Sequence, residues 1–192
     1  MWTNSQDGYG RMARLYHWGM IPLLLGLCGL GFYITTLTYY HPWYRVAPDW
    51  HRSLGLLAFL LAMTRLGWRV YSPPPPLDEG LAPLEKWAAH GVHALLYLLM
   101  FAIPVTGYLL STADGRGVMF LGWFTIPSVL PPIKGLESSA GWIHLILGTA
   151  LLVTAALHAM AALYHHVIRR DRTLLRMLIG PAGNHADFQG ER

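Results

Sequence analysis

The sequence predicts an all-α integral membrane protein, a four-helix bundle with both termini in the cytoplasm. Of its 192 residues 54% are hydrophobic and only 12% are charged, whereas soluble domains contain about a quarter charged residues. Four apolar stretches each reach the ~20 residues needed to cross ~30 Å of hydrocarbon. The Lys and Arg residues concentrate on one side of these stretches, as the positive-inside rule describes.

The candidate spans are about residues 16–37, 51–70, 87–110 and 140–168. The first has no small-residue cleavage site after a short apolar core, so it is interpreted as an anchor and not as a signal peptide. Residues 1–15 before it are expected to be an N-terminal leader, loose over the first ten positions. Residues 16–168 then form the transmembrane domain, and residues 169–192 form a basic cytoplasmic tail suited to anionic lipid.

Four spans place both termini on the same side of the membrane. With the middle loop and the helix ends, that side carries ten of the 14 basic residues, namely Arg11, Arg14, Arg65, Arg69, Lys86, Arg169, Arg170, Arg172, Arg176 and Arg192. The opposite side carries the other four, namely Arg45, Arg52, Arg116 and Lys134. This bias puts the termini in the cytoplasm. It also explains the pI near 9.4 without a nucleic-acid partner.

Two connecting segments have a distinctive composition. Residues 72–84 contain four consecutive prolines and are expected to be a stiff, polyproline-like inner linker. Residues 111–139 form the longest loop and contain an apolar patch at residues 118–126. We expect this patch to form a short lid on the outer membrane surface.

The fourth span contains His144 and His158 and no formally charged residue. Fourteen residues are just under four helical turns, so both imidazoles point in roughly the same direction, with depths ~21 Å apart at ~1.5 Å rise per residue. An ionisable side chain in hydrocarbon is costly and usually marks a function. Two such histidines near opposite membrane surfaces indicate two metal centres in series.

Topology sorts the other histidines by depth. His51 lies at the outer level with His144, whereas His41 precedes a proline in a loop, where a fixed ligand is poorly placed. The outer pair is therefore expected to be His51 with His144. At the inner level His158 is the favoured ligand of the fourth span, and its partner stays open among three residues, namely His17, His90 and His93.

Imidazole binds zinc, copper and haem iron alike. Two histidines at each level, with no carboxylate or thiolate beside them, favour haem over a bare ion. Gly26, Gly29 and Gly31 in the first span allow either close helix packing or room for a flat ring. Two imidazoles would close both axial positions of the iron, which favours electron transfer. Arg65 and Arg69 could reach the inner interface or pair with haem propionates.

The ordered set of motifs resembles the bacterial cytochrome b561 family over roughly residues 9–177. The likeness is carried by R-L-Y-H-W around His17, H-R-S-L-G from His51, M-T-R-L-G-W-R through Arg65 and Arg69, H-G-V-H from His90, L-H-A-M-A-A-L-Y-H-H from Leu157, and D-R-T-L-L-R-M from Asp171. No single motif is decisive, but the order and spacing of the set are specific.

The resemblance implies a four-helix bundle in a bacterial inner membrane, holding two non-covalent b-type haems. It assigns four iron ligands, His51 with His144 for the outer haem and His17 with His158 for the inner haem. Members of the family exchange electrons with quinone, and some take an electron from periplasmic superoxide and deliver it to ubiquinone. By analogy, His165 and His90 would lie near quinone and its protons.

Two functions follow as expectations. The first is a superoxide:ubiquinone oxidoreductase, in which the outer basic residues, Arg52 among them, attract the superoxide anion or balance haem propionates. The second is a haem b anchor that exchanges electrons with a partner dehydrogenase or hydrogenase and has no substrate chemistry of its own. A histidine-lined metal transporter is disfavoured because no intramembrane carboxylate accompanies the histidines.

Overall fold

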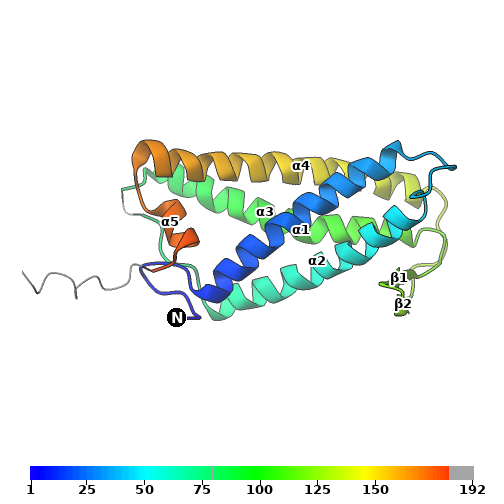
Figure 1. Ribbon diagram of the computed structural model, residues 1–192, viewed down its shortest axis with the longest axis horizontal. Coiled ribbons are helices and arrows are strands. Elements are labelled where there is room, and N and C mark those ends of the chain that lie inside the picture. The colour runs from blue at the N-terminus through cyan, green and yellow to red at the C-terminus, as the bar shows by residue number, and fades with distance from the viewer. Residues whose placement is uncertain (79, 182–192) are drawn as a thin grey trace, which may run out of the picture.

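The computed structural model describes residues 1–78 and 80–181, and in this part of the chain four long helices form an elongated bundle (Figure 1). These helices are α1 (Arg11–Thr36), α2 (Val46–Tyr71), α3 (Pro83–Ser111) and α4 (Leu136–Tyr164). Each is long and apolar enough to cross a membrane, so the prediction of a mostly helical protein with four such helices is confirmed. Both residues 1–10 and the last short helix lie at one end, here called the inner end; the other is the outer end.

The helices begin before the apolar stretches that predict them. Helix α1 begins at Arg11 instead of residue 16, and α4 begins at Leu136 instead of residue 140. A helix can continue beyond the hydrocarbon because its backbone hydrogen bonds remain satisfied within the segment. Helix α3 begins with a proline at its first position, and the Glu85 carboxylate accepts a hydrogen bond of 2.8 Å from the backbone N–H of Ala82, which caps the helix.

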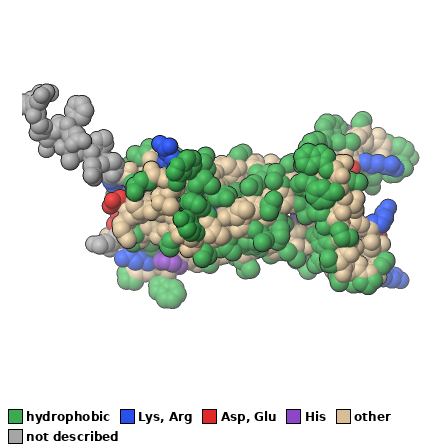
Figure 2. Space-filling view, turned by 90° about the horizontal axis from the view of Figure 1, so that it is seen from below, with side chains coloured by type: hydrophobic (Ala, Val, Ile, Leu, Met, Phe, Trp, Pro, Cys, Tyr) green, Lys and Arg blue, Asp and Glu red, His purple; other side chains and the backbone are tan. Residues whose placement is uncertain are grey.

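Neighbouring helices pack in chain order, α1 on α2, α2 on α3 and α3 on α4, whereas α1 contacts α4 much less. A small buried cluster of Met20, Ala62 and Met100 joins the first three helices. Few large side chains are otherwise buried, and Figure 2 shows hydrophobic side chains along the middle of the visible face with the charged ones at the two ends. This arrangement, with apolar side chains exposed along the middle and charged ones at the ends, is the one expected for a protein surrounded by lipid.

The N-terminal leader is held in place, which differs from the loose segment that its composition suggests. The Asn4 side chain donates hydrogen bonds of 2.8 and 3.0 Å to the carbonyl oxygens of Ser72 and Pro73. The Arg176 guanidinium donates to three further carbonyl oxygens, those of Gln6, Asp7 and Pro76. One charged side chain thereby ties the tail to both the leader and the proline-rich linker.

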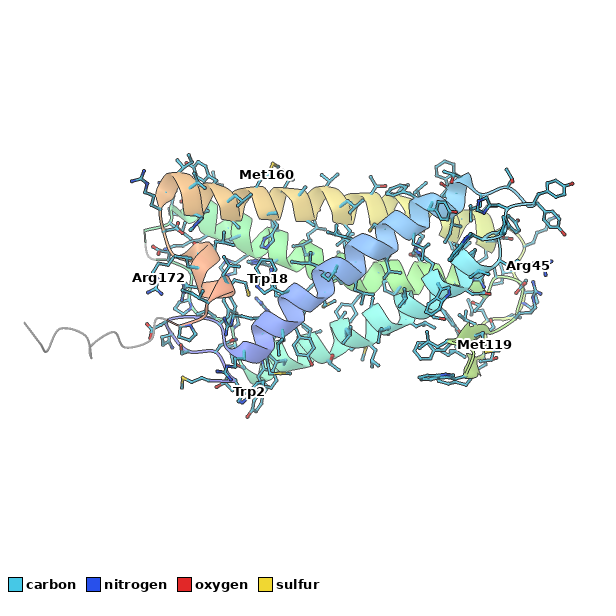
Figure 3. All side chains as sticks on the ribbon, in the orientation of Figure 1. Trp2, Trp18, Arg45, Met119, Met160 and Arg172 are labelled. Atoms are coloured by element: carbon cyan, nitrogen blue, oxygen red, sulfur yellow. The ribbon has the colours of Figure 1, made fainter. Side chains whose placement is uncertain are left out.

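The chain beyond α4 turns back toward the leader. A single π-helical turn, η1 (His165–Arg169), follows α4, and α5 (Thr173–Leu178) then packs at the inner end. The Trp18 indole of α1, which points toward α5 in Figure 3, donates a hydrogen bond of 3.0 Å to the Met177 carbonyl. Residues 182–192 of the expected tail, Arg192 included, lie outside the described residues.

The linker and the outer loop differ in structure. Residues 73–78 form no helix or strand, in agreement with the polyproline-like prediction. The outer loop contains a hairpin of two antiparallel strands, β1 (Val118–Phe120) and β2 (Phe124–Ile126), which pairs Val118 with Ile126. The hairpin was not predicted, because strands of three residues are too short for alternation to show.

Candidate functional site

The outer histidines meet inside the bundle as the sequence predicts. His51 comes from the second turn of α2 and His144 from the third turn of α4, and their ring centroids lie 6.0 Å apart with the ring planes at 76°. Helices α2 and α4 are not among the closely packed helix pairs of the described chain. The two imidazoles therefore face each other between helices whose backbones remain apart.

Hydrogen bonding fixes the His144 ring. Its Nδ1 lies 3.0 Å from the Ile103 carbonyl oxygen of α3, which can only accept, so Nδ1 carries the proton and Nε2 keeps a free lone pair. The Thr106 hydroxyl lies 3.3 Å from the same nitrogen. An imidazole that donates one N–H to a backbone carbonyl and offers the other nitrogen is the usual state of a metal-binding histidine.

The His51 ring is held less firmly than that of His144. Its buried Nδ1 forms no hydrogen bond of good geometry with the described residues, but the Leu27 backbone of α1 lies close enough to interact with the ring.

Two glycines make room for the outer imidazoles. A Cβ at Gly107 of α3 would lie 2.9 Å from Cε1 of His144, and a Cβ at Gly31 of α1 would lie 3.1 Å from Cε1 of His51. By contrast, Gly26 and Gly29 have no atom within 4 Å of such a Cβ. Of the three glycines singled out in the first span, Gly31 is the one whose Cβ would meet an imidazole, whereas Gly26 and Gly29 border open space.

The inner level contains three histidines. His17 of α1 lies 6.2 Å from His158 of α4, and His93 of α3 lies 5.2 Å from the same ring. His90, one helical turn earlier, is exposed, and its Nδ1 lies 2.7 Å from the Lys86 carbonyl oxygen. The structure thus removes His90 from the three candidates for the inner partner and leaves His17 and His93.

Two arginines extend this inner cluster. Arg65 and Arg69 lie 5.5 and 5.4 Å from the centroid of the Tyr97 ring, and neither forms an ion pair with a described acidic residue. The Arg65 Nη2 also lies 3.4 Å from Nδ1 of His17. Two half-buried cations without a carboxylate favour a negatively charged ligand beside the histidines.

Arg52 is differently placed. At the outer end it forms an exposed ion pair of 2.8 Å with Asp49, one helical turn away on α2. An exposed pair of this kind contributes little to stability. The structure therefore places Arg52 at the outer surface, already partnered, and not in the cluster with Arg65 and Arg69.

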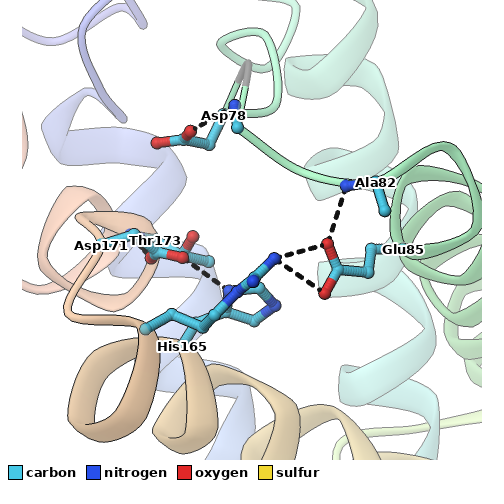
Figure 4. Close-up of polar contacts among 8 residues, drawn as sticks. Asp78, Ala82, Glu85, His165, Asp171 and Thr173 are labelled. Carbon is cyan, nitrogen blue, oxygen red and sulfur yellow. Dashed lines mark hydrogen bonds and ion pairs between the residues drawn. The ribbon is translucent and has the colours of Figure 1, made fainter.

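His165 lies at the junction of α4 and η1, paired with Asp171 (Figure 4). Its Nδ1 lies 2.6 Å from the Asp171 carboxylate, and both side chains are largely shielded. Burial raises the pKa of Asp171, but hydrogen bonds from Thr173 and His165 outweigh it, so the net pKa is lowered. Arg169, the last residue of η1, pairs with Glu85 of α3 at 2.9 Å.

Each of the two histidine pairs has the geometry to bind one metal ion from opposite sides. An imidazole nitrogen binds a metal at about 2 Å and lies about 1 Å from its own ring centroid, so two opposed rings have centroids roughly 6 Å apart. The values of 6.0 and 6.2 Å match this spacing, whereas 5.2 Å for His93 with His158 is shorter. No group of three or more metal-binding side chains occurs within the described residues.

Comparison with known proteins identifies the chain. Residues 8–180 match the model of the family described as prokaryotic cytochrome b561. The protein belongs to this family. Cytochrome b561 homolog 2 of Escherichia coli is 40% identical over 176 residues, which cover 92% of this chain and 94% of that protein. The cytochrome is thus a membrane electron-transfer protein of a family that binds haem b.

Two other relatives differ in their names. The probable superoxide oxidase CybB of Yersinia pestis is 31% identical over 143 residues, covering 72% of this chain and 77% of that protein. Cytochrome b562 of Cereibacter sphaeroides is 29% identical over 181 residues, covering 91% of this chain and 97% of that protein. The similarity to all these cytochromes extends over most of the four-helix bundle.

The side chains at both levels are compatible with haem b. Each level offers two imidazoles at the spacing of opposed ligands, and the outer level also has two glycines beside the rings. The inner level adds two cations without acidic partners. These features are properties of the polypeptide itself.

Of the glycine substitutions, we expect Gly107→Ala to weaken haem binding at the outer level most. The new Cβ would displace the His144 ring, so haem retention after detergent extraction should fall by about half or more, because positioning errors of this size weaken metal binding about tenfold or more. Gly31→Ala should have a weaker effect, since its contact of 3.1 Å is less severe. Gly29→Ala on the same helix is the matched control. Equal haem content in all three variants, measured by pyridine haemochrome, would contradict the role of the glycines.

Proposed function

We propose that this cytochrome carries electrons across the membrane between two haem b groups, from superoxide at the outer end to ubiquinone at the inner end. The observation that carries the proposal is the arrangement of the histidines, which form one pair near each end of the bundle at 6.0 and 6.2 Å. Haem b, when bound, supplies a one-electron carrier at each level. The distribution of Lys and Arg supports cytoplasmic termini, and we place the cytochrome in the bacterial inner membrane.

The proposed ligands are His51 and His144 for the outer iron. For the inner iron they are His17 and His158. The ring spacing favours His17 over His93 as the partner of His158, although Arg65 now lies beside Nδ1 of His17. Arginine only donates, so this contact places the neutral ring's proton on Nε2. An anionic propionate near Arg65 and Arg69 would draw the guanidinium away and free the imidazole to change tautomer.

Superoxide oxidation requires no acid or base from the protein at the outer end. Each superoxide loses one electron and leaves as oxygen, with no proton to move. The chain can contribute a positive field that speeds arrival of the anion. Arg52 and Arg116 are partnered by Asp49 and Asp114, so the unpaired basic residues of the described outer end are Arg45 and Lys134, and Glu137 is an unpaired acidic residue there. The name of the Yersinia pestis relative also supports this substrate.

Quinone reduction at the inner end requires protons. Two superoxide ions, one ubiquinone and two protons yield two oxygen molecules and one quinol. The Asp171 carboxylate accepts a hydrogen bond from the Nδ1–H of His165, which leaves Nε2 of that ring facing away from the pair. This arrangement suits His165 to exchange a proton through Nε2. His90, exposed at the same end, is a second candidate for proton exchange with the solvent.

The alternative function is that of a haem b anchor for a partner dehydrogenase or hydrogenase. Experiments on the purified cytochrome distinguish the two functions. Reduction of ubiquinone by a superoxide-generating system, with one chain type in the preparation, would support the oxidoreductase. Absence of that reaction, together with a redox subunit that co-purifies and donates electrons, would favour the anchor.

Replacing one histidine of each pair should remove one haem at a time. We expect two b-type haems per chain in the native protein and about one in His51→Ala or His17→Ala, because a single imidazole holds haem weakly. His41→Ala, in the outer loop, should keep both. His93→Ala should also keep both if His17 is the ligand. Loss of the inner haem in His93→Ala but not in His17→Ala would reverse that assignment.

Reversing the unpaired outer charges should slow the reaction with superoxide. We expect Arg45→Glu with Lys134→Glu to lower the rate of haem reduction by superoxide about tenfold at low ionic strength, with the difference shrinking as salt screens the field. Arg116→Gln, which removes an already paired charge, is the control. Stopped-flow absorbance of the haem measures the rate, and a salt-independent rate in the double variant would exclude steering.

Removing the Asp171 charge should slow only the reaction with ubiquinone at the inner end. We expect Asp171→Asn to lower ubiquinone reduction about tenfold, since general acid–base groups contribute about 10²–10⁴, while haem reduction by superoxide stays unchanged. Because the pKa of Asp171 is lowered, its stabilising effect is present above the unfolded pKa and is lost as pH falls through the folded pKa. The native activity should therefore show no Asp171 titration near neutral pH. Equal slowing of both half-reactions would indicate structural damage instead.

A further inference from the structure

The outer hairpin is an element without formal charge outside the four helices. Residues 118–126 contain no Asp, Glu, Lys or Arg, whereas an Asp114–Arg116 ion pair precedes the hairpin and Lys134 follows it. Three of its large apolar side chains are exposed: Trp123 is 77% exposed, Phe124 is 54% exposed and Met119 is 50% exposed. An apolar surface of this kind, bounded by charges, indicates contact with a non-aqueous partner.

The hairpin is rigidly attached to helix α2. The Ser53 hydroxyl donates to the Met119 carbonyl oxygen at 3.4 Å and accepts from the Leu121 N–H at 3.0 Å. Val118 is only 3% exposed and anchors the first strand. Two short strands alone are marginally stable in water, so these contacts set the position of the hairpin.

The point of attachment gives the depth of the hairpin. Helix α2 has 26 residues, hence a length of ~39 Å, about 9 Å more than the ~30 Å hydrocarbon layer. The extra length reaches the headgroup region, and Ser53 directly follows Arg52, whose exposed ion pair with Asp49 belongs at that level. The hairpin is therefore attached to α2 at the outer membrane interface.

The hairpin also extends sideways from the bundle, toward the region that lipid would occupy. Figure 1 shows β1 and β2 beside the outer part of the bundle, level with the outer turns of α2 and not above its end. Figure 3 shows Met119 on this lateral extension. The tip has a left-handed backbone at Leu121 and Gly122, with φ of 50° and 76°, and Trp123 follows directly. Phe120 packs against Trp123 and Phe124 at centroid distances of 6.4 and 5.3 Å.

We propose that the outer hairpin is a lipid-binding element whose Trp123, Phe124 and Met119 side chains enter the outer interface of the bilayer beside α2. Trp50 of α2 is exposed as well. Aromatic residues are enriched at this depth because their rings favour the boundary between headgroups and acyl chains. The hairpin therefore anchors the outer end of α2, the helix that carries His51, and this inference is independent of the electron donor.

Spin labels in lipid nanodiscs test the proposal. In a Cys28→Ala background, a nitroxide at Trp123→Cys should be accessible to oxygen and shielded from a water-soluble nickel chelate. Labels at Arg116→Cys and Leu60→Cys provide the water and acyl-chain references. We expect the oxygen-to-nickel accessibility ratio at position 123 to be about threefold higher than at position 116 and lower than at position 60. Phe124→Cys repeats the measurement if the first variant does not fold.

Three results would overturn the proposal. Nickel accessibility at position 123 equal to that at 116 would place the hairpin in water. Shielding from both reagents would mean that protein covers it. Spin–spin broadening that disappears on dilution with unlabelled chain would identify the occupant as a second copy instead of lipid.

Discussion

Polar groups inside hydrocarbon must find partners within the protein, and this constraint acts most strongly on the interior imidazoles. At the outer level His144 is held by the Ile103 carbonyl, and the rings of His51 and His144 are given space by Gly31 and Gly107. The separation of α2 and α4 follows from the same need, because two opposed rings occupy the space between them. Helix spacing, glycine positions and one hydrogen bond are therefore consequences of placing a histidine pair at this depth.

The two ends of the bundle are built for different tasks. The outer end has exposed aromatic side chains, the hairpin that we propose enters lipid, and the unpaired basic residues Arg45 and Lys134, which can attract a superoxide anion. The inner end holds three histidines, two arginines without acidic partners and the His165–Asp171 pair. Its leader, proline-rich linker and α5 are tied together by Arg176, which closes this end around the groups that would handle protons.

Much of the architecture was accessible from the sequence. The number of spanning helices followed from four apolar stretches, and the meeting of His51 with His144 followed from depth, because topology leaves a histidine little freedom along the membrane normal. Depth could not choose between His17 and His93, since both enter at the inner level from different helices. The residue-based prediction also could not find the hairpin or the ordered leader, whose positions depend on Ser53, Asn4 and Arg176, far away in sequence.

The sequence alone determined the fold class and the depth of each histidine, because hydrophobicity and helical rise act along one axis. Only the tertiary structure decided which rings face each other, since lateral packing sets the rotation of each helix about its axis. It brought His93 to within 5.2 Å of His158 and left His90 exposed. It likewise paired His165 with Asp171 through a π-helical turn, a local departure from α-helical geometry that apolar patterning does not encode.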